Sequence, residues 1–94
     1  MFSMTVEDVF VIAGRGLVAT GRVESGTLRV GEEVQLDGGV SARVDAIEKF
    51  RKTLDEAVAG ENVGLLLSNL TKGQIGRGTV LTSDGASGGI TVNL

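Results

Sequence analysis

The side chains best suited to binding an anion form one basic cluster, residues 49–52, in which Phe50 is the only aromatic residue. Arg51 carries a planar guanidinium that can hold a phosphate or a carboxylate through paired hydrogen bonds. It can also form an exposed ion pair with Glu48 or Asp55, an interaction worth only ~0 to 1 kcal/mol. Because neighbouring side chains of a strand point to opposite faces, Phe50 points away from its basic neighbours and is expected in the core.

Catalysis has few side chains to draw on in this chain. The 94 residues include no cysteine and no histidine, which excludes disulfides, thiolate nucleophiles, zinc sites of the usual kind and imidazole bases. The twelve acidic residues show no spacing that differs from ordinary surface carboxylates. We therefore expect a protein that is not an enzyme, with no catalytic residue, metal site or cofactor.

The glycine-rich stretch at residues 14–21 invites comparison with a phosphate-binding loop. Such a loop ends in a Lys-Ser/Thr pair and opens a helix whose free amide groups face the phosphates. Here the glycines join two strand patterns, and the sequence has no Asn-Lys-x-Asp run to recognise guanine. We expect a β-turn at this position, and neither binding nor hydrolysis of GTP by this chain.

Charge and hydropathy exclude two further classes of protein. The net charge of −3 argues against binding to duplex DNA, which requires a broad basic face, although a small local contact with RNA remains compatible with it. No apolar run approaches the ~20 residues of a membrane helix, and the first residues lack the basic and apolar regions of a secretion signal. We expect one cytoplasmic domain, monomeric and without a membrane partner.

Apolar residues recur with period 2 or in β-branched runs, which predicts a chain made almost entirely of strands separated by glycine turns. The alternation breaks at Ile47, so we expect a β-bulge near residues 45–47, a feature common at barrel rims and binding sites. Apolar residues on both faces at residues 9–12 indicate a barrel seam. The expected strands are 4–13, 17–24, 33–36, a strand from Val40 onward, 54–57, 63–67 and 79–82, with a tight turn at 37–39 and a loop or single helical turn at 72–78.

Six or seven short strands at this spacing predict an all-β fold, a small closed antiparallel β-barrel, because closure removes exposed edges. We expect the barrel to occupy residues 1–82. Residues 83–89 then form a Gly/Ser-rich linker, and residues 90–94 a strand-like C-terminal tail. The expected core includes Phe10, Val23, Val44, Val63, Leu65 and Leu67.

Several motifs together carry a family resemblance. They are Val6-Glu7-Asp8-Val9-Phe10, Thr20-Gly21-Arg22-Val23-Glu24, Val30-Gly31-Glu32-Glu33-Val34, Phe50-Arg51-Lys52, Gly60-Glu61-Asn62-Val63-Gly64 and Arg77-Gly78. In these motifs the chain resembles the second domain, a β-barrel, of bacterial elongation factor Tu and related translation GTPases. The resemblance implies the same barrel as a free-standing domain without GTPase activity, because in that family the GTPase chemistry sits on a different domain.

In that family the surface of the barrel holds the aminoacylated 3′-terminal adenosine of tRNA. The resemblance implies an adenine slot lined by Ile12, Gly14, Val18 and Leu66, with Glu48 at its edge. It also implies that Arg51 lies near the terminal phosphate or ester, and that Glu7, Asp8, Phe10 and Asn62 surround the amino acid. Such a set is physically sensible, since an apolar slot sandwiches a base, a carboxylate accepts from a ribose hydroxyl and a guanidinium balances the phosphate.

Two hypotheses about function remain open at this point. The first is a non-catalytic barrel that binds the tRNA 3′ end or a similar adenosine-bearing ligand, and the presence of Glu48, Arg51 and Asn62 favours it. The second is a protein-interaction or scaffold module with no RNA binding, whose partner is a translation-related protein. The acidic net charge favours this second hypothesis. So does the absence of the GTPase and third domains, which the family's high affinity also needs. The chain departs from the family pattern at Thr5, Leu17, Lys49 and the pair Ser68-Asn69.

Overall fold

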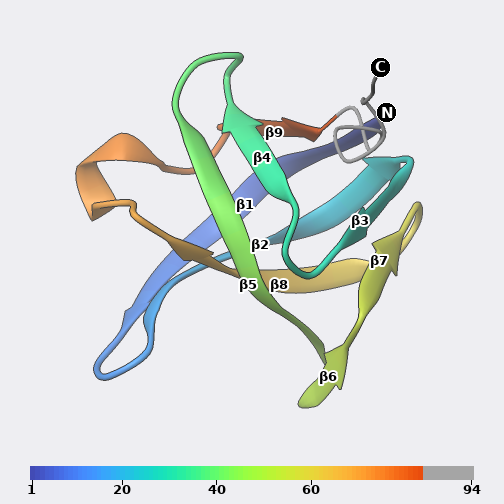
Figure 1. Cartoon of the computed structure of the whole chain (residues 1–94), viewed down its shortest axis with the longest axis horizontal. Helices are drawn as coiled ribbons and strands as arrows, with labels where there is room; N and C mark the ends of the chain where they lie inside the picture. Colours follow the sequence, from blue (N-terminus) through green and yellow to red (C-terminus); the bar gives the residue numbers. More distant parts are fainter. Residues whose placement is uncertain (84–94) are drawn as a thin grey trace, which may run out of the picture.

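Six antiparallel strands close into a ring in the computed structural model, which describes residues 1–83 (Figure 1). Pairing of β4 with both β5 and β9 completes the ring. The prediction of a closed antiparallel barrel is therefore confirmed. In their order around the ring, the strands are β4 (Glu33–Leu36), β9 (Val80–Ser83), β1 (Phe2–Ile12), β2 (Gly16–Ser25), β8 (Asn62–Ser68) and β5 (Ser41–Lys49).

Three short strands lie outside the ring. β6 (Lys52–Leu54) extends the sheet beyond β5, whereas β3 (Thr27–Arg29) and β7 (Glu56–Val58) form a separate two-stranded sheet. The strand expected at 54–57 is therefore split at Asp55, whose carbonyl accepts the N–H of Val30. Strand β3 was not expected from the sequence. The one helical element of residues 1–83 is a 3₁₀ turn, η1 (Lys72–Gln74), which lies in the expected segment 72–78.

The interior of the barrel is filled by apolar side chains from every strand of the ring. Its largest fully buried members include Phe2, Met4, Ile47, Leu65 and Leu81. Five of the six expected core residues are confirmed as buried: Val23, Val44, Val63, Leu65 and Leu67.

Phe10 corrects the sixth core prediction, because it is 51% exposed. A bulge shifts the register of β1 between Val6 and Asp8, so Glu7 is the extra residue. Val6 and Val9 both pack on the core side as a result, and Phe10 points outward. The pairing of β1 with β9 ends at Thr5, whereas β2 stays paired with β8 as far as Leu17. The apolar residues 9–12 lie on the far part of the β1–β2 hairpin, here called the ribbon, which projects from the barrel (Figure 1).

Phe50 is also exposed, at 83%, and the expectation that it lies in the core is wrong. Lys49 pairs with Lys52, which leaves Phe50 and Arg51 as the two central residues of a tight hairpin turn. Their φ angles of 52° and 67° are those of a type I′ turn, in which both central residues are left-handed. Phe50 therefore belongs to a turn, where strand alternation does not apply.

The bulge predicted near residues 45–47 is confirmed by a register shift between Val44 and Ala46 in the pairing of β5 with β8. The tight turn predicted at 37–39 is confirmed too, with φ angles of 50° at Asp37 and 75° at Gly38. Val40, at which the following strand was expected to begin, is 48% exposed because it closes this turn through its carbonyl and precedes β5.

The end of the barrel lies one residue beyond the expected boundary, because Ser83 belongs to β9. The predicted linker after Ser83 and the predicted tail at 90–94 lie outside the described residues. Within residues 1–83, no helix is long and apolar enough to cross a membrane.

Candidate functional site

The outer face of β1, β2, β8 and β5 carries two rows of side chains that cross the strands. Strand pairing places Phe10 opposite Val18, Val18 opposite Leu66, and Leu66 opposite Ala46. In the next row Asp8, Thr20, Gly64 and Glu48 are paired in the same way. These residues face outward because the rows that alternate with them, such as Ala19, Leu65 and Ile47, are fully buried in the core.

Two β-bulges, one in β1 and one in β5, align the outward-facing residues of these strands with those of β2 and β8. The extra residue Asp45 lets both Val44 and Ile47 point inward, so that Ala46 and Glu48 line up outward with β8. The extra residue Glu7 does the same in β1 and leaves Glu7 and Asp8 both exposed. Without either bulge, one edge of the outer face would present core residues instead of these carboxylates.

The first row forms an apolar floor on the outside of the barrel. Val18 is only 9% exposed although it faces outward, because it lies between Phe10 and Leu66. Gly64 has no side chain to cover the neighbouring part of this face. A Cβ at this position would lie 3.2 Å from Val18 Cγ1. Ile12, which pairs with Gly16 further along the ribbon, is 39% exposed.

An open groove of about 250 Å³ adjoins this floor. Its rim is charged through Glu7, Glu48 and Lys49, whereas glycines at 21 and 64 leave its base bare. The groove is lined by Glu7, Thr20, Gly21, Glu48, Lys49, Phe50, Asn62, Val63 and Gly64.

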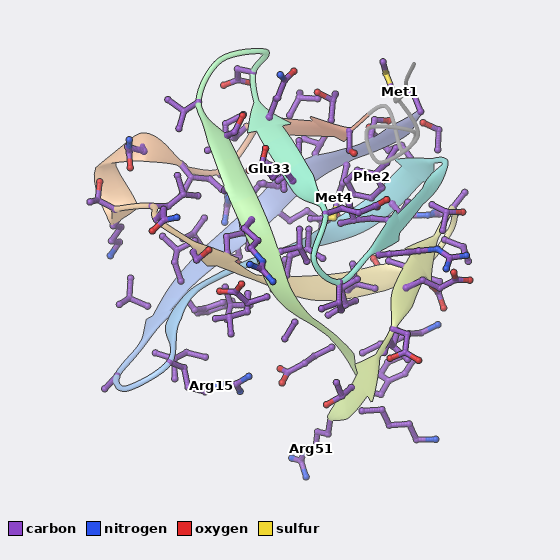
Figure 2. The ribbon with its side chains drawn as sticks, in the orientation of Figure 1. Met1, Phe2, Met4, Arg15, Glu33 and Arg51 are labelled. Carbon is purple, nitrogen blue, oxygen red and sulfur yellow. The ribbon has the colours of Figure 1, made fainter. Side chains whose placement is uncertain are left out.

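The structure brings most of the predicted site residues onto this one face. Glu7, Glu48 and Asn62 line the groove, and Asp8, Phe10, Val18 and Leu66 occupy the two rows beside it. Ile12 and Gly14 lie further out, at the end of the ribbon and in its turn. Arg51 stands apart at the tip of the β5–β6 hairpin, where Figure 2 shows it pointing away from the barrel.

Two ion pairs control the charges around the groove. Arg15, in the turn between β1 and β2, places its Nη2 3.1 Å from Glu48 Oε2. Lys49 places its Nζ 3.2 Å from Glu61 Oε2, while the other carboxylate oxygen of Glu61 accepts the N–H of Val58 at 2.9 Å. The hydrogen bond from Val58, and after it the contact with Lys49, lower the pKa of the Glu61 carboxyl.

Within residues 1–83, no three side chains of His, Cys, Asp or Glu are grouped so that they could hold a metal ion. What the arrangement can do is bind. It offers an apolar floor, carboxylate acceptors at its edge and the guanidinium of Arg15 beside Glu48.

Several residues of this face were missed from the sequence. Thr20 and Gly64 could have been found, since they share a strand face with the predicted Val18 and Leu66 through period-2 alternation. Arg15 carried no such signal, because its contact with Glu48 depends on the register of strands that are distant in sequence.

Comparison with known proteins agrees with this architecture. The family model described as elongation factor Tu domain 2 matches residues 16–82. The chain belongs to this family. In translation factors, elongation factor Tu domain 2 is a non-catalytic domain.

A solved structure similar to this domain 2 is that of translation elongation factor SelB from Methanococcus maripaludis in its apo form. The two share 35% sequence identity and superpose with a TM-score of 0.82. The match covers 89% of this chain and 18% of that one, so the chain spans about a fifth of the length of the elongation factor. The comparison concerns one domain of a larger factor.

Proposed function

We propose that this domain binds the aminoacylated 3′ end of tRNA, or a similar adenosine-bearing ligand, on the outer face of β1, β2, β8 and β5. Binding takes place in the cytoplasm and involves no catalysis by the domain. The observation that carries the proposal is the register of the two rows, which places an apolar floor beside a row that has Asp8 of β1 at one end and Glu48 of β5 at the other.

Each group has a physical role in this proposal. An adenine base lies on Val18 and Leu66, with Ile12 and Gly14 beyond it, because a π-face stacks on apolar surface without needing a hydrogen-bond pattern. Glu48 accepts a hydrogen bond from the ribose. Arg51, at the hairpin tip, balances the charge of the terminal phosphate.

The groove takes the aminoacyl part of the ligand in this proposal. Glu7 and Asp8 offer carboxylates to its α-ammonium group, and the amide of Asn62 can both donate to and accept from the ester. Phe10 covers the amino-acid side chain from the ribbon side.

Shift mapping by NMR tests the proposal directly. The isotope-labelled chain is titrated with aminoacyl-adenosine and, separately, with a short CCA oligonucleotide. We expect saturable shifts at Val18, Glu48, Asn62 and Leu66, with an affinity in the micromolar to millimolar range. If these residues do not move at millimolar ligand, the proposal fails.

Substitutions separate the two parts of the ligand. Arg51→Ala should weaken binding of the oligonucleotide and reduce the slope of log K against log salt by about one unit, since one phosphate contact is lost. Asn62→Ala should weaken aminoacyl-adenosine more than bare adenosine. Arg29→Ala, which removes an exposed guanidinium paired with Glu56 on the separate β3–β7 sheet, serves as the matched control and should change neither.

A protein-interaction module is the second candidate function. The exposed apolar side chains of the ribbon favour it, because Phe10 and Val11 are 51% and 62% exposed on opposite faces of β1. Its partner in this case is a translation-related protein. Shifts confined to the ribbon on addition of such a protein, with no response to adenosine ligands, would select this function over the first.

A further inference from the structure

The outer face of the barrel carries three carboxylates. Glu7, Asp8 and Glu48 all lie on it or at its edge. A ligand that carries a phosphate therefore meets repulsion unless a cation of the protein compensates for it.

Two of the nearby cations have acidic partners of their own, and a third points away. Lys49 is held by Glu61 in a partly buried pair, and Arg77 lies 3.8 Å from Asp8 and donates from Nε to the carbonyl of Glu7. Arg51 projects from the hairpin tip, away from the floor (Figure 2).

Arg15 is placed differently. It stands in the turn at the end of the ribbon, beside the floor, and reaches across to Glu48 on the far side of β8. Both side chains of the pair are exposed, at 46% and 39%. Because exposed pairs are weak, releasing this one changes an equilibrium constant by no more than about fivefold.

We infer that Arg15 exchanges partners when the ligand binds, from Glu48 in the free chain to the ligand's phosphate in the complex. This inference rests on the proposed function and deepens it. A ribose hydroxyl that bonds to Glu48 displaces the guanidinium, and the displaced guanidinium then joins Arg51 in balancing the charge of the phosphate. Arg15 thereby makes the face select phosphorylated adenosine over neutral adenosine.

The test compares adenosine with 5′-AMP, which differ only in the phosphate. Affinities of the full chain are measured by NMR titration for the parent and for Arg15→Ala. The parent should bind 5′-AMP more tightly than adenosine. In Arg15→Ala, adenosine should bind up to about fivefold more tightly, because its competitor for Glu48 is gone, whereas 5′-AMP should bind more weakly. The order of the two ligands should therefore reverse.

Two further variants serve as controls for this comparison. Arg15→Gln keeps the length of the side chain without its charge and should show the same reversal. In a Glu48→Gln background, Arg15→Ala should no longer tighten adenosine, because the pair that it breaks is already absent. The ligand-free spectrum of each variant reports whether the fold is intact.

The outcomes separate this inference from the proposed function. If Arg15→Ala weakens both ligands equally or leaves both unchanged, the exchange is overturned while adenosine binding stands. If neither ligand gives saturable shifts at Val18 and Glu48 of the parent, the proposed function fails and the inference fails with it. A reversal in both Arg15 variants supports the exchange.

Discussion

Lys49 and Glu61 form the least exposed ion pair among residues 1–83, with Nζ 3.2 Å from Oε2 and side chains 28% and 25% exposed. The pair ties the end of β5 to the turn that precedes β8, at the rim of the groove. Glu61 also accepts the N–H of Val58, and Lys49 lies 5.5 Å from the centre of the Phe50 ring. The Glu61 carboxylate thus holds both the turn that precedes β8 and the Lys49 ammonium group at the candidate site.

Acid should weaken the fold partly through Glu61. Its pKa in the folded chain is lowered from the ordinary 4.5 by the Val58 hydrogen bond and by Lys49. The ionised carboxylate therefore stabilises the fold above its unfolded pKa, and this contribution is lost as pH falls through the lower folded pKa. Urea unfolding between pH 7 and pH 3 should show a shallower loss of stability for Glu61→Gln than for the parent. The control is Glu33→Gln, at an exposed position of β4. Its loss of stability with falling pH should equal that of the parent, and an equal loss in both variants would contradict the prediction.

Leu65→Ala should cost ~2 to 5 kcal/mol, because Leu65 is fully buried and its removal leaves a cavity in the ring. Phe10→Ala removes a larger side chain, yet Phe10 is 51% exposed, so its cost should be clearly smaller. Urea denaturation monitored by circular dichroism measures both. A cost for Phe10→Ala that equals the cost for Leu65→Ala would mean that the ribbon packs on the core.

Gly21→Ala should destabilise the chain by ~1 to 3 kcal/mol. A Cβ at Gly21 would overlap the carbonyl oxygen of Thr5 on the neighbouring strand, and backbone cannot move aside as a side chain does. Gly73→Ala is the matched control, since a Cβ there meets nothing within 4 Å, and it should change stability by less than ~0.5 kcal/mol. Equal melting temperatures for the two variants would refute the close approach.

Arg51→Gly should stabilise the chain by ~1 kcal/mol, because Arg51 has a left-handed φ of 67° that glycine adopts without cost. The gain in the free energy of unfolding is measured with urea. Lys52→Gly, one residue later in β6, should destabilise instead, since glycine weakens a strand. Under the proposed function, Arg51→Gly also weakens oligonucleotide binding, so the strained turn trades stability for a ligand contact. A loss of stability would show that the Arg51 side chain contributes more than its strain costs.

GTP with magnesium should not raise the melting temperature of this chain at millimolar concentration. The glycines at 14 and 16 belong to a turn between β1 and β2, with φ angles of 80° and 129°, and no helix follows them to present free amides to a phosphate. A thermal shift with GTP that phosphate alone does not reproduce would overturn this prediction.

The strands of the ring follow from local patterns, which explains why the sequence predicts them well. Alternation from Leu17 to Val23 and from Val63 to Leu67 reports directly which side chains are buried. The bulge at Asp45 was also readable, because it left a visible break at Ile47. The bulge at Glu7 left none. Val9 and Phe10 after it are both apolar, so either one fits the buried face, and Phe10 was assigned to the wrong face.

The candidate site was predictable only as a set of residues. The family resemblance named Glu48 and Leu66, but their relation to Arg15 depends on pairings across three strands, which a single sequence does not contain. Phe50 was misjudged for a related reason. A two-residue turn with bulky residues at positive φ is unfavourable, so local propensity argues against the conformation that tertiary pairing of Lys49 with Lys52 imposes.

The last strand of the ring has a consequence for how the chain is made. β9 pairs with β1 on one side and with β4 on the other, so the ring of strands cannot close until residues 80–83 have been synthesised. While the chain is being synthesised, β1 and β4 each present an open edge that another nascent chain can join. Closure pairs residues 2–5 with residues 80–83, from opposite ends of the barrel's sequence. Because pairing between residues so distant in sequence is slow, we expect closure to be the slow step of folding. The barrel is therefore most exposed to misassembly just before its final strand leaves the ribosome.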